Sequence, residues 1–380
     1  MYILIEKAIV SDMKKSILFL GNSSLVIFKF RKELIEHFRD LGYELYVSFP
    51  SGPFGDGEEI AKTFGCKFFE TPIDRRGRNP LHDLRLLISY HRIIKAIKPD
   101  IVLAFTVKPD IYGGLVCRWQ NIAFVANITG LGKGLAEEGA TKHLLCSLYR
   151  IALKKAKCVF FQNEADQAFF LRNKIKLRYQ ECLPGSGVNL QEYNVLDYPS
   201  DEKIIFTYVA RVMKTKGIDE YLQAAEVLGR KYENIEFHIC GFCEEDYQAI
   251  LDEKVRRGEI IYHGLVSDVI PYLEQSHCVV LPSFHPEGIS NVLLEGAACG
   301  RPLITTNRPG CRETVDDGNS GYLVKEQDVA DLIDKMEQFI HLTNEQRRQM
   351  GLRGRKWIEK RFDRKIIVEA YNRIVISSNI

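Results

Sequence analysis

Short apolar runs alternate with amphipathic stretches along the first half of the chain. The apolar runs are bounded by turn residues and are too short for buried helices, so they predict strands. Apolar positions that recur every three or four residues predict helices between them. The predicted strands span residues 16–22, 44–49, 67–70, 100–105, 121–127 and 158–162, and the predicted helices span 29–41, 81–97, 144–157 and 164–173.

The alternation stops in a polar stretch around residues 183–202 and then restarts. The second series predicts strands at 203–209, 235–240, 260–263, 278–282, 302–306 and 321–324, and helices at 217–230, 269–275, 290–299, 329–341, 344–362 and 365–376. Alternating strands and helices imply parallel strands joined by right-handed crossovers. We therefore predict an α/β protein with two Rossmann-like, doubly wound parallel-sheet domains. They comprise residues 1–190, with 1–15 as an N-terminal extension, and 191–360, followed by a C-terminal helix in 361–380.

Charge adds a difference between the halves. The whole chain has a net charge of +2, which predicts no nucleic-acid partner. Residues 1–190 hold 28 basic and 19 acidic side chains, whereas residues 191–380 hold 24 basic and 31 acidic ones. Such asymmetry suggests different partners for the two halves. The basic half suits an anionic acceptor or an anionic membrane surface.

Cysteine use and hydropathy indicate the compartment. Several of the ten cysteines lie inside apolar runs, which predicts buried, reduced thiols in a cytoplasmic protein. Cys240 and Cys243 form a single CxxC with no second pair, and we interpret it as a strand end rather than a metal site. No run approaches the roughly 20 apolar residues of a transmembrane helix.

The strongest chemical signal is a pair of carboxylates eight positions apart. Glu287 follows a predicted strand, and Glu295 lies in the next predicted helix. Backbone N–H groups at a helix N-terminus bind phosphate, and a neighbouring carboxylate can hold sugar hydroxyls. The simpler alternative is one surface glutamate and one helix glutamate. The amides that we assign to a donor diphosphate belong to Gly288, Ile289, Ser290 and Asn291.

A second signal is a pair of cations in the turn after the first strand of the second half. Arg211 and Lys216 can hold a diphosphate, the arginine by its planar fork and the lysine as a point charge. Basic residues near turns are ordinary on their own. Together with the two glutamates they predict a nucleotide-sugar site.

These motifs resemble those of glycosyltransferase family 4, a retaining family with the GT-B fold. The E-x7-E motif of the family is matched by Glu287 and Glu295, and its phosphate clamp is matched by Arg211 and Lys216. Its PGxGV(D/N) element between the domains is matched by residues 184–189. The similarity covers nearly the whole chain from residue 16, and it resembles most the branch that builds bacterial capsule and O-antigen repeat units.

The resemblance implies two facing Rossmann-like domains with the active site in the cleft. Residues 191–360 would bind a UDP-sugar donor, residues 1–190 would bind a saccharide acceptor, and the helix in 361–380 would cross back to the first domain. Glu287 would contact the donor sugar, as the catalytic carboxylate, and Glu295 would contact the ribose. Arg211 and Lys216 would neutralise the leaving diphosphate, so we expect no metal and no other cofactor.

The first half offers loops rather than side chains. Gly21 and Asn22 follow the first strand, and Thr129, Gly130 and Gly132 follow a later one. Family members often carry a glycine pair in the first loop and a histidine near the second. This chain has one glycine and no histidine there, so no catalytic side chain in this half is predicted. A cationic loop at residues 75–78 fits an acceptor phosphate or an ordinary turn, and His82, His91 and His143 fit ordinary helix positions.

The resemblance also implies an acceptor linked to undecaprenyl diphosphate and peripheral contact with the inner face of the cell membrane. The stretch 142–157 mixes leucines with lysines. It can bind an anionic membrane surface, or its leucines can simply pack on the sheet while its lysines face water. Two other functions stay open at this point. One is a nucleotide-sugar epimerase of the same architecture, and the other is a non-catalytic subunit of a two-chain transferase.

Overall fold

The computed structural model describes residues 14–51, 57–74, 79–136 and 138–377. The chain divides into two compact units, Met1–Ser186 with Lys365–Ile380, and Gly187–Arg364. We call them the first and second units and describe each by itself. All ten cysteines are free thiols, and eight of them are buried. Among the residues that the structure describes, no helix has the length and apolar character needed to cross a bilayer.

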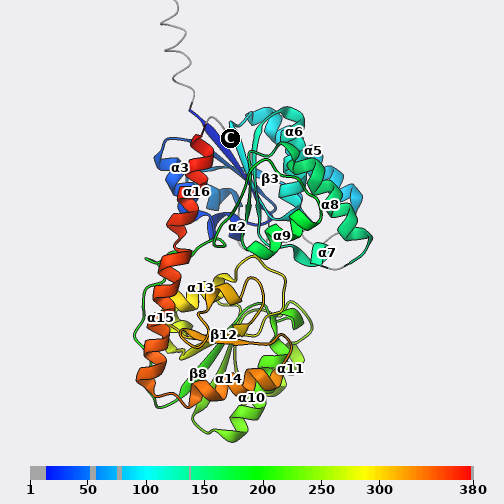
Figure 1. Cartoon of the computed structure of the whole chain (residues 1–380). Helices are drawn as coiled ribbons and strands as arrows, with labels where there is room; N and C mark the ends of the chain where they lie inside the picture. The colour runs from blue at the N-terminus through cyan, green and yellow to red at the C-terminus, as the bar shows by residue number, and fades with distance from the viewer. Residues whose placement is uncertain (1–13, 52–56, 75–78, 137, 378–380) are drawn as a thin grey trace, which may run out of the picture. The chain divides into compact units, whose positions relative to one another are not determined.

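The first unit is built on a seven-stranded sheet of order β3-β2-β1-β4-β5-β6-β7 in which every pair is parallel. Strands β1 and β4 are buried along their whole length, because helices cover both faces (Figure 1). The strands are β1 (Ser16–Leu20), β2 (Glu44–Phe49), β3 (Lys67–Glu70), β4 (Ile101–Phe105), β5 (Ala123–Ile128), β6 (Cys158–Phe161) and β7 (Gln180–Cys182). The helices are α2 (Ser24–Phe28), α3 (Lys32–Asp40), α4 (Gly57–Thr63), α5 (Pro80–Ile97), the π-helical turn η1 (Pro109–Gly113), α6 (Gly114–Gln120), α7 (Gly132–Ala136), α8 (Ala140–Ala152), η2 (Leu153–Lys155) and α9 (Glu164–Arg172).

The last helix, α16 (Arg364–Ile376), packs on the first unit. Ile367, Tyr371 and Ile374 are buried in the same core as β1 and β4. The side-chain Nδ2 of Asn127 in β5 donates a 2.7 Å hydrogen bond to the Tyr371 hydroxyl. Because both groups are fully buried, this bond satisfies polar atoms that would otherwise be costly to remove from water. The C-terminal helix is thus an integral part of the first unit's core.

The second unit has a six-stranded parallel sheet of order β10-β9-β8-β11-β12-β13. Its strands are β8 (Ile204–Val209), β9 (Ile235–Cys240), β10 (Ile261–Gly264), β11 (Cys278–Leu281), β12 (Leu303–Thr306) and β13 (Gly321–Val324). Its helical segments are η3 (Lys214–Lys216), α10 (Ile218–Lys231), α11 (Gln248–Arg256), α12 (Ile270–Gln275), α13 (Asn291–Ala298), η4 (Arg312–Thr314), α14 (Val329–Ile340) and α15 (Asn344–Phe362). Both sheets have the doubly wound strand order, so the predicted fold class is confirmed.

Candidate donor-binding site

Charged side chains gather where three neighbouring strands of the second unit end. Strands β9, β8 and β11 lie side by side and run parallel, so their carboxyl ends meet at one edge of the sheet. Glu244 follows β9, Arg211 follows β8, and Glu287 follows β11. The strand order reverses between β8 and β11, which is where ligands bind in open α/β sheets.

The centre of this site is an ion pair between Lys216 and Glu287. The Lys216 ammonium donates to both Glu287 carboxylate oxygens, at 2.9 and 2.7 Å. The side chains are only 9% and 18% exposed, so the pair is largely removed from water. The Ser283 hydroxyl donates to the same carboxylate at 3.4 Å. An ammonium has three donors, so one stays available to a phosphate oxygen while the pair is intact.

A glycine lets the lysine approach the end of β11. Gly217 has φ +78°, and a Cβ on it would lie 2.1 Å from the Pro282 carbonyl oxygen. Just beyond, the Phe284 amide donates to the Thr215 carbonyl at 2.9 Å. Only glycine tolerates both the left-handed backbone and this contact. The Lys216-Gly217 sequence therefore positions the ammonium beside a carboxylate that lies 71 residues further along the chain.

A second close approach shapes the loop that carries Glu287. Gly310 has φ +95°, and a Cβ there would lie 2.7 Å from the Glu287 carbonyl oxygen and 2.8 Å from that of Gly288. The Ser290 amide donates to the Gly310 carbonyl at 2.8 Å. This bond occupies an amide that the sequence assigned to the diphosphate. The Ile289 side chain is buried in the core, so it anchors the loop.

One of the four amides that the sequence assigned to the diphosphate, that of Ser290, is therefore already bound. Helix α13 begins at Asn291, and the first amides of a helix have no partner within the helix. The Asn291 Oδ1 atom is buried and has no hydrogen-bond partner in the part of the chain that the structure describes. Binding of a diphosphate by the amides of Gly288, Ile289 and Asn291 stays a prediction, whereas the Ser290 amide is already bound within the loop.

The Arg211 side chain is more exposed than that of Lys216. Its guanidinium lies 3.4 Å from the Glu244 carboxylate, and its side chain is 37% exposed. The Tyr208 hydroxyl donates to the Arg211 carbonyl at 3.2 Å, which helps to fix the backbone at this position. Glu244 was missed by the sequence analysis, because nothing in its acidic, turn-rich stretch indicates that it meets an arginine 33 residues earlier.

Glu295, the second carboxylate of the motif, is buried on α13 with only 4% of its surface exposed. Its neighbour is Tyr193. Burial is the main cause that raises the pKa of the Tyr193 hydroxyl, and the nearby negative charge of Glu295 is the second cause. The Tyr193 carbonyl accepts a hydrogen bond from Arg355 at 2.6 Å. Glu295 is thus held in a polar, enclosed environment, and its contact with a ribose stays a prediction.

The first-unit loops named by the sequence lie at the carboxyl ends of β1 and β5. Gly21 donates to the Ser48 carbonyl at 3.0 Å, and the Asn22 Oδ1 atom is buried without a partner among the described residues. Thr129 is half-buried, and Gly130 and Gly132 have φ +122° and +64°. The cationic loop at residues 75–78 lies outside the described residues.

Comparison with known proteins shows the family to which the chain belongs. Residues 197–357 match the family model of glycosyl transferases group 1, and residues 16–163 match the glycosyl transferase 4-like model. The capsular polysaccharide biosynthesis glycosyltransferase CapM of Staphylococcus aureus is 30% identical over 305 residues, which are 76% of this chain and 79% of that protein.

Two further similarities cover nearly the whole chain. The N,N'-diacetylbacillosaminyl-diphospho-undecaprenol alpha-1,3-N-acetylgalactosaminyltransferase of Campylobacter jejuni is 25% identical over 371 residues, which are 93% of this chain and 96% of that protein. Anabaena Alr3699/HepE, solved with UDP and glucose, superposes with a TM-score of 0.76 at 18% identity and covers 94% of this chain and 98% of its own. The chain belongs to the group 1, family 4-like glycosyltransferases of bacterial surface polysaccharide synthesis, which have the GT-B fold.

Proposed function

We propose that this chain transfers a hexosyl or N-acetylhexosaminyl group from a UDP-sugar to a lipid-linked saccharide, with retention of configuration. The observation that carries the proposal is the buried Lys216–Glu287 ion pair at the edge where β8 and β11 end. In this proposal the cation of the pair binds the diphosphate, and its carboxylate accepts hydrogen bonds from sugar hydroxyls. The name of the Campylobacter relative supports an undecaprenyl-diphosphate acceptor.

In this reaction the bond between the anomeric carbon and the diphosphate oxygen breaks, and a bond from that carbon to an acceptor hydroxyl oxygen forms. The departing diphosphate takes the hydroxyl proton on the same face of the sugar. Arg211 and the third Lys216 donor stabilise the negative charge that develops on the diphosphate, which is the main catalytic task. Glu287 orients the sugar by accepting from its hydroxyls, and Glu295 accepts from the ribose.

Charge neutralisation by side chains makes a divalent metal unnecessary in this proposal. Arg211 and Lys216 would contact the diphosphate oxygens that a bound Mg²⁺ would otherwise contact. Activity should therefore survive EDTA, and a full dependence on Mg²⁺ or Mn²⁺ would contradict this part of the proposal.

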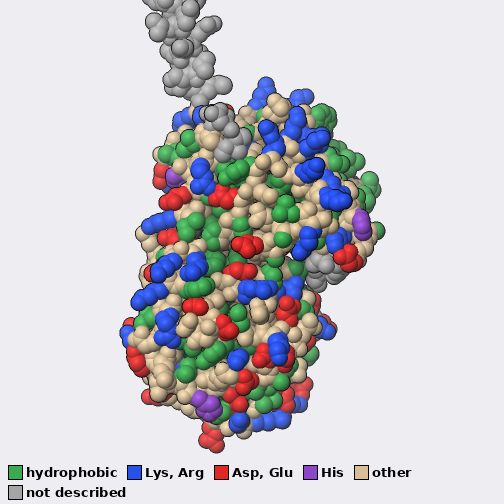
Figure 2. Space-filling view, in the orientation of Figure 1, with side chains coloured by type: hydrophobic (Ala, Val, Ile, Leu, Met, Phe, Trp, Pro, Cys, Tyr) green, Lys and Arg blue, Asp and Glu red, His purple; other side chains and the backbone are tan. Residues whose placement is uncertain are grey.

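Peripheral membrane contact is part of the same proposal, with a changed set of residues. Within the predicted stretch 142–157, Leu144 and Ile151 are exposed, but Leu153 is fully buried. Lys157 donates to the Ser377 carbonyl at 2.5 Å, so it is engaged within the unit. Helices α5 and α6 extend the exposed apolar surface, and Figure 2 shows Lys and Arg side chains gathered beside it. The exposed apolar side chains on these helices are Leu81, Leu84, Ile88 and Trp119.

Vesicle co-sedimentation tests the membrane contact. Each lysine near an anionic surface contributes about 1 kcal/mol, so the Lys154→Glu, Lys155→Glu double variant should release the protein from anionic vesicles at low salt. Neutral vesicles are the control. Equal binding to both vesicle types would remove membrane contact from the proposal.

The transfer reaction is tested with the purified chain, a panel of nucleotide sugars and an undecaprenyl-diphosphate-linked saccharide. We expect a lengthened saccharide and released UDP. Interconversion of UDP-sugars without acceptor would instead identify an epimerase. Donor binding without turnover, restored by a second chain, would identify a subunit of a two-chain transferase.

A further inference from the structure

Two segments of the second unit carry the two partners of the buried ion pair. Lys216 ends the turn η3, and Glu287 lies in the loop between β11 and α13. The Phe284 amide donates to the Thr215 carbonyl at 2.9 Å, so the backbones of the two segments are in contact. A second contact between the same segments comes from side chains to which the proposed transfer reaction gives no role.

This side-chain contact joins Thr215 and His285. The Thr215 hydroxyl oxygen lies 2.9 Å from His285 Nδ1, which is a normal hydrogen-bond distance. Both residues are half-buried, so the bond is partly shielded from water. A hydroxyl can donate or accept, and Nδ1 accepts or donates according to the state of the ring. The bond can therefore form with a neutral or with a protonated imidazole.

The backbone of His285 extends this contact toward Glu287. The His285 amide donates to the Ser283 hydroxyl oxygen at 3.2 Å, and the Ser283 hydroxyl donates to Glu287 Oε1 at 3.4 Å. The other acceptor near this hydroxyl is the Thr215 carbonyl at 3.5 Å. A charged carboxylate accepts more strongly than a neutral carbonyl. Hydrogen bonds thus lead from the turn η3 to the Glu287 carboxylate by a route that does not pass through the ion pair.

This second route becomes important when a diphosphate is bound. The Lys216 ammonium then divides its three donors between the diphosphate and Glu287. With the ion pair as its only support, the carboxylate would move whenever the lysine moves. The Thr215–His285 bond and the Ser283 hydroxyl still hold the loop. The carboxylate therefore keeps its place while the ammonium binds the phosphate.

We propose that His285, held by Thr215, is a positioning residue of the transfer reaction and keeps the Glu287 carboxylate in place for the donor sugar. The proposal rests on the transferase function proposed above. It assigns to the imidazole no proton transfer and no contact with the diphosphate. Loss of the Thr215–His285 bond should therefore lower turnover and leave the affinity for UDP nearly unchanged.

A double-mutant cycle at these two positions tests the proposal. His285→Ala removes the ring, and Thr215→Val removes the hydroxyl at nearly constant volume. Each change should lower kcat with a UDP-sugar about three- to ten-fold, because each removes the same hydrogen bond. The double variant should lose no more than either single variant, since two partners of one bond are not additive. Calorimetric titration should give UDP affinities within about two-fold of wild type.

Two further variants separate positioning from general damage. His285→Asn can place a side-chain nitrogen or oxygen near the position of Nδ1, so it should recover much of kcat. His341→Ala is the matched control, because His341 is an exposed histidine at the end of α14 whose ring lies 3.4 Å from the Tyr232 hydroxyl. It should leave kcat as in wild type. Combined with Thr215→Val, it should give the loss of Thr215→Val alone.

Urea unfolding of all these proteins controls for folding. If His285→Ala lowers the unfolding midpoint, Thr215→Val, which removes only a hydroxyl, carries the test. Wild-type kcat in Thr215→Val, losses that multiply in the double variant, or a fall in UDP affinity as large as the fall in kcat would each overturn the role of His285 alone. A wild-type protein that transfers no sugar from any UDP-sugar would instead overturn the proposed function, and with it this role.

Discussion

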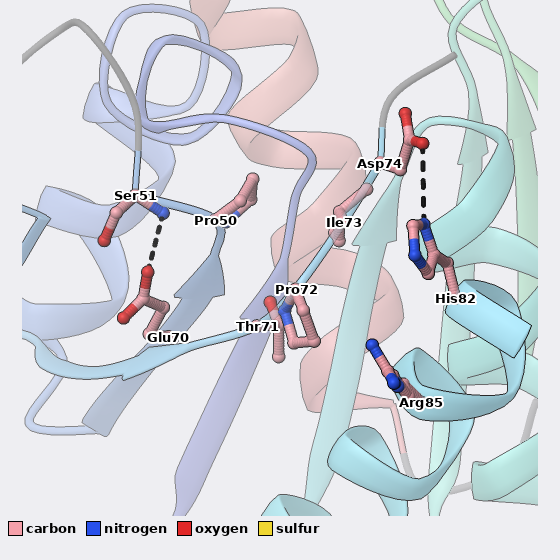
Figure 3. Close-up of a pocket in the computed structure, with 9 residues that line it drawn as sticks. All are labelled: Pro50, Ser51, Glu70, Thr71, Pro72, Ile73, Asp74, His82 and Arg85. Carbon is pink, nitrogen blue, oxygen red and sulfur yellow. Dashed lines mark hydrogen bonds and ion pairs between the residues drawn. The ribbon is translucent and has the colours of Figure 1, made fainter. Parts of the chain in front are cut away.

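The two units use the same sheet edge in different ways. In the second unit the edge holds a buried ion pair, and glycines let neighbouring backbones close around it. In the first unit the edge holds loops and a cavity where β2 and β3 end and α5 begins (Figure 3). Two side chains of its wall, His82 and Asp74, are 46% and 44% exposed. A buried pair tolerates little change, since loss of one partner leaves an uncompensated charge. The edge of the second unit's sheet should therefore tolerate substitution less well than the edge of the first unit's sheet.

Removing Lys216 should produce the largest effect. Lys216→Ala leaves the Glu287 carboxylate largely buried without its cation, which should destabilise the second unit by up to about 3 kcal/mol. Donor turnover should fall by a hundred-fold or more, because both the diphosphate contact and the carboxylate geometry are lost. Urea unfolding and UDP release measure the two effects.

The control for this variant is Lys214→Ala, two residues earlier on the same turn and exposed. It should change neither quantity appreciably. A Lys216→Ala protein as stable and as active as the Lys214→Ala protein would show that the ion pair has no role in the donor site.

Glu287 and Glu295 should respond differently to the same change. Glu287→Gln should lower sugar transfer more than UDP affinity, because its carboxylate is assigned to the sugar. Glu295→Gln should mainly weaken UDP binding, because its carboxylate is assigned to the ribose. Turnover at saturating donor, together with UDP titration, separates the two. Equal loss of UDP affinity in both variants would refute the separate assignments.

Arg211→Ala should be milder than Lys216→Ala for stability and still costly for activity. The side chain is partly exposed, so the unfolding midpoint should stay near wild type. Loss of a charge-assisted contact to the diphosphate should reduce kcat/KM about ten- to a hundred-fold. Arg211→Lys keeps the positive charge and loses the planar guanidinium, so its kcat/KM should fall between those of wild type and Arg211→Ala. Wild-type kcat/KM in the alanine variant would remove Arg211 from the clamp.

Acidification should have the smallest effect on stability, and this effect should have opposite signs in the two units. In the second unit burial lowers the pKa values of His238, His263 and His277. The unfolded chain then binds more protons below about pH 6.5, so this unit should lose stability as the pH falls through that value. In the first unit burial raises the pKa of Asp110 well above 3.8. The folded chain therefore holds this proton more tightly than the unfolded chain does. The stability that results is present at low pH and is lost as the pH rises through the raised pKa.

Hydrogen exchange at pH 8 and pH 5, analysed separately for peptides of each unit, measures this difference. Correcting for intrinsic exchange, second-unit protection should fall on acidification. Asp110→Asn should weaken the pH dependence of the first unit and leave that of the second unchanged. An identical pH response of both units in wild type and variant would contradict the assignment.

Hydrophobic patterning predicted most of the fold, and the misses have physical causes. The stretch that forms η1 and α6 contains Pro109, Gly113 and Gly114, which usually mark a loop. In the structure those glycines let the helix pack closely on the sheet, because a Cβ on Gly113 would lie 2.7 Å from the Leu20 side chain. Helix α11 was missed because it is polar, with Leu251 as its one buried residue.

The site was predicted as a set of residues but not as a set of contacts. The motif spacing names Glu287 and Lys216, yet no sequence pattern reports that they pair across 71 residues. Gly310 looks like an ordinary turn residue, and only the fold shows that its carbonyl binds the Ser290 amide. The cavity beside Arg85 brings together the ends of two strands and the start of a helix, so local patterning could not reveal it.

Calorimetric titration of wild type and Arg211→Ala with UDP and with uridine tests the central claim most directly. The claim is that the carboxyl edge of the second unit's sheet binds the diphosphate of a UDP-sugar. The substitution should weaken UDP binding about ten- to a hundred-fold and leave uridine binding nearly unchanged, because only UDP has the charge that Arg211 is proposed to contact. Equal weakening for both ligands, or a wild-type protein that binds UDP no more tightly than uridine, would contradict it.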